Sequence, residues 1–151
     1  MKKTILSAFA ALLIAGSAWA DTVRMGTEGA YPPYNFVNDN GEVDGFEKDV
    51  GDMLCIRANL DCVWVINEWD SIIPNLVSGN YDTIIAGMSI TAERDEVIDF
   101  TQEYFPPSPS VYMGLSGSDV DLDGGVIAAQ TATIQAGYVA ESGATLVEFA
   151  S

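Results

Sequence analysis

Residues 62–86, CVWVINEWDSIIPNLVSGNYDTIIA, alternate between two hydrophobic patterns. The run at 62–66 is apolar and rich in β-branched residues, which indicates a buried strand. Apolar residues at helical spacing then follow Asp70, a good helix N-cap, and Pro74 falls close enough to the helix start to be tolerated. The apolar run at 82–86 predicts a second strand. Strand, helix and strand in this order predict a parallel sheet with a right-handed crossover.

The chain on the N-terminal side extends the same pattern. Residues 22–27 predict a further strand, and apolar residues at helical spacing predict a helix at about 46–58, with acidic residues in its first turn. After the second strand, Thr91 can cap a short helix that starts at about Ala92. We therefore expect this first lobe to be α/β.

After the first lobe the pattern changes. A proline-rich stretch precedes a strand-like run at 110–115, and residues 116–125 are rich in Gly, Ser and Asp. A strand at 126–129, a helix from about Thr133 and a strand at 145–149 then predict the start of another β-α-β unit.

The expected organisation is two lobes of α/β class. We assign residues 21–112 to a nearly complete first lobe and residues 113–151 to the truncated start of a second lobe. No elements follow that could complete the second sheet, so we expect a fragment or a truncated gene product.

The first twenty residues have the pattern of a secretory signal peptide. Lys2 and Lys3 precede an apolar run at 5–14, and residues 18–20, AWA, form a small-x-small cleavage pattern. The alternative is a membrane anchor, but the apolar run is short and has no basic stop-transfer flank. We expect cleavage before Asp21 and a soluble mature chain, without stable insertion in the membrane.

Composition excludes several classes of function. Removing residues 1–20 takes away two of the six basic residues and none of the 22 acidic ones, which leaves a net charge of −18. Such a surface repels phosphate backbones and anionic lipids, so we expect no nucleic-acid partner. The chain has no histidine, which excludes a Ser-His-Asp triad and any His-ligated metal. We expect no metal and no cofactor.

Cys55 and Cys62 are the two cysteines of a chain that is expected to be secreted. In an oxidising compartment pairing is the expected fate of such residues, and the alternative is two buried free thiols. Neither reading makes these residues catalytic.

Candidate binding residues stand where the predicted strands end, because ligands of open parallel sheets bind beyond the carboxyl ends of the strands. They are Glu28 and Tyr31 after the first strand, Glu68 and Trp69 after the second, Gly87 to Ser89 after the third, and Arg94 three residues past Thr91.

Arg94 is the most informative of these residues. A cation in the first turn of a helix opposes the helix dipole, which costs roughly 0.3 to 1 kcal/mol. A guanidinium beside free backbone N–H groups is well suited to hold a carboxylate. The alternative is a surface salt bridge to an acidic neighbour, such as Glu93 or Asp95.

The other candidates also have ordinary alternatives. Tyr31 and Trp69 offer flat faces to a ligand side chain, or they pack under a loop. Glu28 can be a solvated loop carboxylate. Gly87 allows a tight turn, and its lack of a side chain also lets a ligand approach backbone N–H groups.

Several motifs in order resemble family 3 of the bacterial solute-binding proteins. They are GTEGAYPPY at 26–34, DGFEKD at 44–49, EWDSIIPNL at 68–76, and YDTI at 81–84 with MSITAER at 88–94. The resemblance covers about residues 21–138 and is nearest to the lysine/arginine/ornithine-, histidine- and octopine-binding group. That group has a cysteine pair at this spacing, which favours a disulfide between Cys55 and Cys62.

The resemblance implies a periplasmic, two-lobed clamshell that closes on an amino acid. Arg94 matches the arginine that holds the ligand α-carboxylate, and Ser89 and Gly87 match positions that bond the ligand's backbone groups. Tyr31 and Trp69 match aromatic residues that sandwich the ligand side chain.

Two more positions carry an implied role. Glu28 matches an acidic position that meets a distal cationic group, and Thr133 matches a second-lobe contact to the carboxylate. The chain departs from the family at Ala86-Gly87, where a serine pair is common, so side-chain hydroxyl bonds are lost there. The family's second-lobe aspartate, which binds the α-amino group, lies beyond Ser151.

We therefore expect capture of a basic or opine-like amino acid without chemistry, by a monomer that delivers its ligand to the membrane subunits of an ABC importer. One alternative is a periplasmic enzyme similar to cyclohexadienyl dehydratase, although no clear general acid other than Glu28 is present. Another is the extracellular sensory domain of a receptor.

Overall fold

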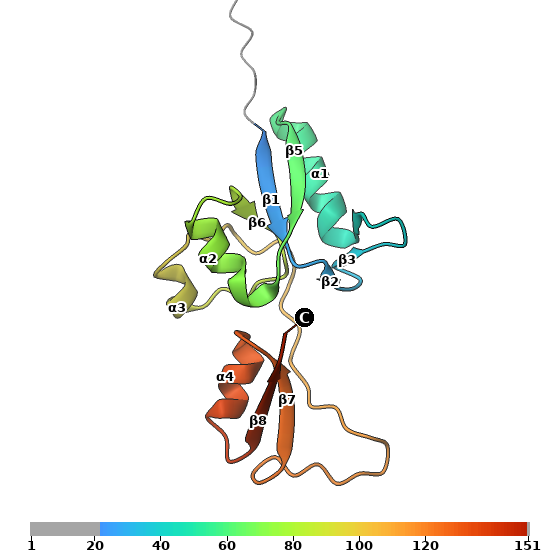
Figure 1. The fold of residues 1–151 in the computed structure, drawn as a ribbon, viewed down its shortest axis with the longest axis vertical. Helices are drawn as coiled ribbons and strands as arrows, with labels where there is room; N and C mark the ends of the chain where they lie inside the picture. The colour runs from blue at the N-terminus through green and yellow to red at the C-terminus, as the bar shows by residue number, and fades with distance from the viewer. Residues whose placement is uncertain (1–21, 151) are drawn as a thin grey trace, which may run out of the picture.

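The computed structural model describes residues 22–150 and shows two lobes joined by an extended connection (Figure 1). The first lobe holds six strands and helices α1 to α3, and the second holds β7, α4 and β8. The predicted α/β class is confirmed. The predicted signal peptide lies outside the described residues.

A three-stranded parallel sheet forms the centre of the first lobe. Its middle strand is β1 (Val23–Thr27), which pairs with β5 (Cys62–Ile66) on one side and with β6 (Thr83–Ile84) on the other. The parallel sheet predicted from residues 62–86 is confirmed, and β6 is shorter than the predicted run at 82–86.

Helix α1 (Phe46–Ala58) has the predicted bounds, and its buried face is formed by Glu47, Gly51 and Cys55. These positions are four residues apart, so they lie on one side of the helix. A Cβ atom at Gly51 would come within 2.6 Å of the Trp64 ring on β5, so the close approach of helix and sheet requires glycine there.

Helix α2 (Ile72–Val77) begins differently from the prediction. A 3₁₀ turn, Trp69–Ser71, leads directly into it, and Asp70 lies inside that turn. The prediction that Asp70 is the N-cap was therefore wrong. Because the 3₁₀ turn already provides the first turn of the helical segment, α2 begins without a side-chain cap.

The core of the first lobe forms where α2 meets the sheet. Ile72, Tyr81 and Ala86 are buried together, and the Tyr81 hydroxyl donates a hydrogen bond to the Ile72 carbonyl. A Cβ atom at Gly26 of β1 would lie 2.6 Å from the Tyr81 ring. The sheet can therefore admit the tyrosine ring only because position 26 is glycine.

A small antiparallel sheet was missed by the sequence analysis. It consists of β2 (Ala30–Tyr31), β3 (Asn35–Val37) and β4 (Val43–Asp44). Strands of two or three residues are too short to show a hydrophobic period. This sheet carries Tyr31 at the end of the first lobe that faces the second (Figure 1).

The two remaining helices each begin at a threonine cap, and the cap at Thr91 was predicted. In α3 (Ala92–Asp95) the Thr91 hydroxyl accepts a hydrogen bond from the Arg94 N–H at 3.2 Å. In α4 (Ile134–Ala140) the Thr133 hydroxyl accepts from the Ala136 N–H at 3.1 Å. Each bond satisfies one of the free N–H groups at a helix start.

In the second lobe, β7 (Val126–Gln130) pairs in parallel with β8 (Thr145–Phe149), as predicted. Residues 110–115 are not a strand, which corrects the prediction made from their apolar pattern. All six are exposed, and no strand among the described residues pairs with them. An extended segment becomes a strand only when a neighbour supplies the backbone hydrogen bonds.

The part of the chain that the structure describes, residues 22–150, contains no helix that is both long and apolar enough to cross a bilayer.

The predicted disulfide between Cys55 and Cys62 is confirmed, and it joins the end of α1 to the start of β5. Because the loop is short, replacing both cysteines by serine should lower the free energy of unfolding by about 2 kcal/mol. The measurement is chemical denaturation of the mature chain, with reductant added to the unchanged chain as a control. An unchanged midpoint in both the variant and the reduced chain would contradict this expectation.

Arg24 and Asp82 clamp β1 to the turn before β6. The Arg24 side chain donates two hydrogen bonds to the carboxylate, at 2.8 Å and 3.1 Å, and the Arg24 backbone N–H donates a third at 2.8 Å. The side-chain bonds, followed by the backbone bond, lower the pKa of Asp82 from 3.8 to about 2. A lowered pKa in the folded chain means that Asp82 favours folding above pH 3.8 and loses this effect as the pH falls toward 2.

We expect Asp82→Asn to flatten the pH dependence of stability within that acidic window. Thermal unfolding of the mature chain, followed across the window, measures the effect, and Asp39→Asn on the exposed β3–β4 turn is the matched control. The expectation fails if Asp82→Asn and Asp39→Asn give curves of the same slope.

Candidate ligand-binding site

The candidate site lies where the carboxyl ends of β1 and β5 face the second lobe (Figure 1). Glu28 directly follows β1, Trp69 begins the 3₁₀ turn that comes after β5, and the loop after β6 carries Gly87. In the second lobe, the segment 130–133 runs from the end of β7 to the start of α4 and belongs to the same site. The residues predicted to bind a ligand therefore come from both lobes.

Arg94 reaches across from α3 to the second lobe. Its guanidinium donates to the Ser89 carbonyl at 2.8 Å and to the Ala132 carbonyl at 3.2 Å, and it lies 5.5 Å from the centre of the Trp69 ring. Burial lowers the pKa of Arg94, and the nearby Glu93 opposes that shift. The alternative of a salt bridge to an acidic neighbour was wrong, because the ion pairs among residues 22–150 do not include Arg94.

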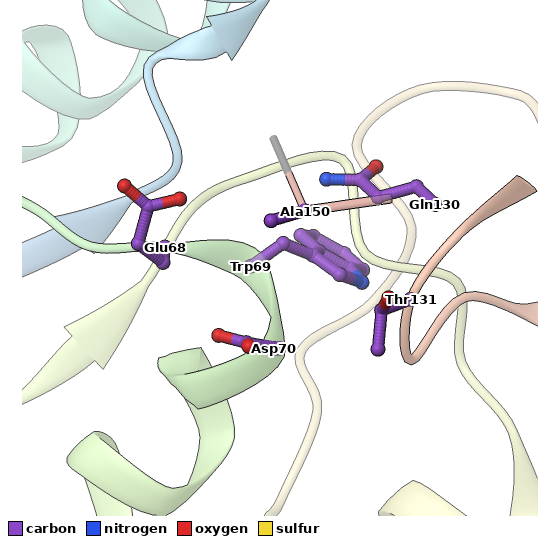
Figure 2. Close-up of a pocket in the computed structure, with 6 residues that line it drawn as sticks. All are labelled: Glu68, Trp69, Asp70, Gln130, Thr131 and Ala150. Atoms are coloured by element: carbon purple, nitrogen blue, oxygen red, sulfur yellow. The ribbon is translucent and has the colours of Figure 1, made fainter. Parts of the chain in front are cut away.

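Trp69 joins the same contact. Its indole Nε1–H donates to the Ala132 carbonyl at 3.1 Å, so this one carbonyl accepts from Trp69 and from Arg94. Ala132 has a φ of 58°, in the left-handed region. Figure 2 shows the Trp69 ring projecting toward Gln130 and Thr131, with which it lines a small recess.

Glu28 is almost buried, with 9% of its surface exposed, which contradicts the alternative of a solvated loop carboxylate. Gln130 of the second lobe donates a hydrogen bond from its side-chain amide to Glu28 Oε1. A carboxylate that is removed from water needs such donors. The pair is a second connection between the lobes, in addition to the Ala132 carbonyl.

Tyr31 and Gly87 lie together. The Tyr31 ring stacks on Tyr34 with 5.0 Å between ring centres, and it also lies over Gly87, where a Cβ atom would be 3.3 Å from the ring. Gly87 has a φ of 59°, so it needs glycine for the turn as well. Its N–H donates to the Glu47 carboxylate at 2.6 Å, so the donor that we expected a ligand to approach is already used within the protein.

The hydroxyl of Thr133 already makes hydrogen bonds within the protein. Besides capping α4, it donates to the Gln130 carbonyl at 2.7 Å. A contact from Thr133 to a carboxylate would therefore use its backbone N–H. Ser89 contributes its carbonyl to Arg94.

An open cleft of about 640 Å³ separates α2 and α3 from α4. Of the seven predicted residues, Trp69, Arg94 and Thr133 line it, together with apolar side chains of both lobes. Glu28, Tyr31, Gly87 and Ser89 stand outside this lining.

Several residues around the site were not predicted from the sequence. The buried Glu47 and Asn35 form hydrogen bonds with each other, and Glu47 also bonds the Gly87 N–H and the partly exposed Tyr104, while Gln130 contacts Glu28. Glu47 stands in the first turn of α1, where an acidic residue is explained by the helix dipole alone. The available signal was its spacing of four residues from Gly51, which places it on the face turned to the sheet.

The two α/β lobes thus hold an arginine, an indole ring and a carboxylate at the place where they contact each other. The chain belongs to family 3 of the bacterial extracellular solute-binding proteins, whose model matches residues 23–143. The two-lobed clamshell that the resemblance implied is thereby confirmed.

Relatives of known name agree with this assignment. The octopine-binding periplasmic protein of Rhizobium meliloti is 46% identical over 104 residues, which are 68% of this chain and 35% of that protein. The ABC transporter arginine-binding protein 1 of Escherichia coli is 35% identical over 111 residues, 74% of this chain and 46% of that protein. The chain thus spans less than half the length of these two relatives.

A solved structure resembles the chain as well. It is a periplasmic His/Glu/Gln/Arg/opine family-binding protein from Silicibacter pomeroyi in complex with lysine, 76% identical, with a TM-score of 0.79. The match covers 84% of this chain and 57% of that protein.

Proposed function

We propose that this chain supplies the first lobe and the start of the second lobe of a periplasmic protein that captures a basic or opine-like amino acid for an ABC importer. The single observation that carries the proposal is Arg94, a partly buried guanidinium between the lobes whose hydrogen-bond partners are neutral carbonyls. The lobe boundaries 21–112 and 113–151, the monomeric state and the docking on the importer's membrane subunits belong to the same proposal.

The chemistry of Arg94 suits a ligand carboxylate. A guanidinium has five donors in a fixed fork, and two of its nitrogens here donate to the Ser89 and Ala132 carbonyls. A carboxylate that approaches can accept two parallel, charge-assisted bonds, which are stronger than bonds to neutral carbonyls. Closure of the lobes over the ligand excludes water and strengthens these bonds further.

Glu28 supports the preference for a cationic ligand. Its carboxylate is nearly buried and negatively charged, and it accepts a hydrogen bond from the side-chain amide of Gln130. A ligand held at Arg94 by its carboxylate and extending toward Glu28 would bring a cationic group to that carboxylate. The names of the relatives, which include octopine, arginine and lysine as ligands, support the same choice.

The test uses a chimera in which residues 21–150 are joined to the remaining part of the 76%-identical relative. Calorimetry of this chimera should show binding of lysine, arginine, ornithine or octopine, and much weaker binding of glutamate and leucine. Residues 21–151 alone should bind weakly or not at all, because part of the closed-lobe contacts is missing. A chimera that folds and binds none of the basic ligands would refute the proposal, and turnover of prephenate or arogenate would favour the dehydratase alternative.

A further inference from the structure

Glu47 is a buried carboxylate beneath the candidate site. Only 1% of its surface is exposed, and the ion pairs among residues 22–150 do not involve it. A buried charge without a cation is costly unless several hydrogen-bond donors surround it. Its position therefore calls for an explanation beyond packing.

Three donors from three separate segments bond to this carboxylate. The Asn35 side-chain amide donates to Oε2 at 2.6 Å, while the Gly87 N–H at 2.6 Å and the Tyr104 hydroxyl both donate to Oε1. Asn35 in turn accepts from the Gly29 N–H at 2.8 Å. The network therefore joins the loop after β1, the loop after β6, and the segment that contains Tyr104.

Helix capping does not account for Glu47. The first N–H groups of α1 donate to backbone carbonyls: Phe46 to Pro33 at 3.1 Å, and Glu47 to Tyr34 at 2.8 Å. These two N–H groups are thus satisfied without the Glu47 side chain, which makes no capping bond. What the carboxylate adds is a contact between the two site loops and Tyr104.

Tyr104 belongs to the segment 96–125, which runs from α3 of the first lobe to β7 of the second. Burial raises the pKa of Tyr104, and the hydrogen bond to Glu47 raises it further. The hydroxyl therefore remains a donor at every physiological pH. It shares Oε1 with the N–H of Gly87, the residue over which the Tyr31 ring lies.

We propose that Glu47 is a positioning residue that anchors the connection between the lobes, through Tyr104, to the loops that form the ligand site. This inference rests on the proposed function. The Glu47–Tyr104 bond holds one end of the connection in place. It thereby determines how the second lobe moves relative to the first, and so how Ala132 approaches Arg94. The closure equilibrium, and not only the stability of the first lobe, then depends on the Glu47–Tyr104 bond.

The decisive variant is Tyr104→Phe in the chimera, because it removes one hydroxyl and keeps the ring. We expect lysine to bind about five- to twentyfold more weakly, the range of a modest coupling between sites. Tyr112→Phe, on the same connection, is the matched control and should bind as the unchanged chimera does. Equal lysine affinity in the two variants would overturn the proposal, as would a lower Tm for Tyr104→Phe with unchanged affinity.

A second readout needs no ligand. Small-angle scattering of the mature chain should give a broader distribution of distances for Tyr104→Phe than for Tyr112→Phe, because the connection is released at one end. Identical distributions would overturn the anchor even if the chimera bound no amino acid. If lysine fails to bind the unchanged chimera while the distributions differ, then the proposed function fails and the anchor stands.

Glu47→Gln, with Glu42→Gln on the exposed β3–β4 turn as control, completes the design. In the double variant Glu47→Gln/Tyr104→Phe, the fold-loss of lysine affinity should be smaller than the product of the two single fold-losses. The reason is that both changes remove the same bond. Independent, multiplicative effects would contradict the shared contact. If Glu47→Gln does not fold, the comparison of Tyr104→Phe with Tyr112→Phe decides alone.

Discussion

Arg94→Ala in the chimera should weaken every amino acid that the protein binds, by roughly 3 to 5 kcal/mol. The α-carboxylate is common to all amino acids, so loss of its bidentate partner does not depend on the ligand side chain. The same change also removes the bond to the Ala132 carbonyl, which connects the two lobes. Calorimetric titration with lysine, arginine and ornithine measures the loss.

Two further variants show which property of Arg94 causes the loss of affinity. Arg94→Lys keeps the charge without the planar fork, so its affinity should fall between those of the unchanged chimera and the alanine variant. Arg57→Ala, in the last turn of α1, removes an exposed cation and should leave binding unchanged. Strong lysine binding by Arg94→Ala would show that the carboxylate is held elsewhere.

Glu28→Gln should weaken basic ligands by roughly 1.5 to 3 kcal/mol, the contribution of a charged hydrogen bond. The glutamine retains an oxygen that can accept from Gln130, so the connection between the lobes survives while the negative charge is lost. Uncharged amino acids should be affected far less, which distinguishes this variant from Arg94→Ala.

Glu68→Gln is the charge-matched control for that experiment, since Glu68 stands beside Trp69 at the small recess but is exposed to solvent. It should change the affinity for basic ligands only slightly. If both variants weaken lysine equally, the effect comes from the general negative charge of the site. If the parent binds glutamate or leucine best, the assignment of Glu28 is wrong.

Long periodic elements could be predicted from the sequence because their patterns are local. The bounds of α1, the parallel sheet that contains β1, β5 and β6, and the cap at Thr91 agree with what spacing and residue type predict. The apolar run at 110–115 misled us because a strand also needs a partner, and sequence pattern carries no information about partners.

The site was predictable as a set of positions but not as a set of bonds. Strand ends in a parallel sheet share one edge, and of the candidates Trp69, Arg94 and Thr133 line the cleft between the lobes while Glu28 contacts Gln130. Whether a donor is free depends on contacts between distant segments, as at Gly87, whose N–H is used by Glu47. The buried face of α1 shows the same limit, because its buried glutamate and glycine do not stand out as apolar residues in the sequence.

The Cys55–Cys62 bridge has a consequence for the order in which the protein matures. Its two ends are only seven positions apart, so its formation requires no distant part of the polypeptide. In an oxidising compartment the two cysteines can therefore pair without any contribution from β7, α4 or β8. A chain oxidised in that way would complete its first lobe with the end of α1 already joined covalently to the start of β5.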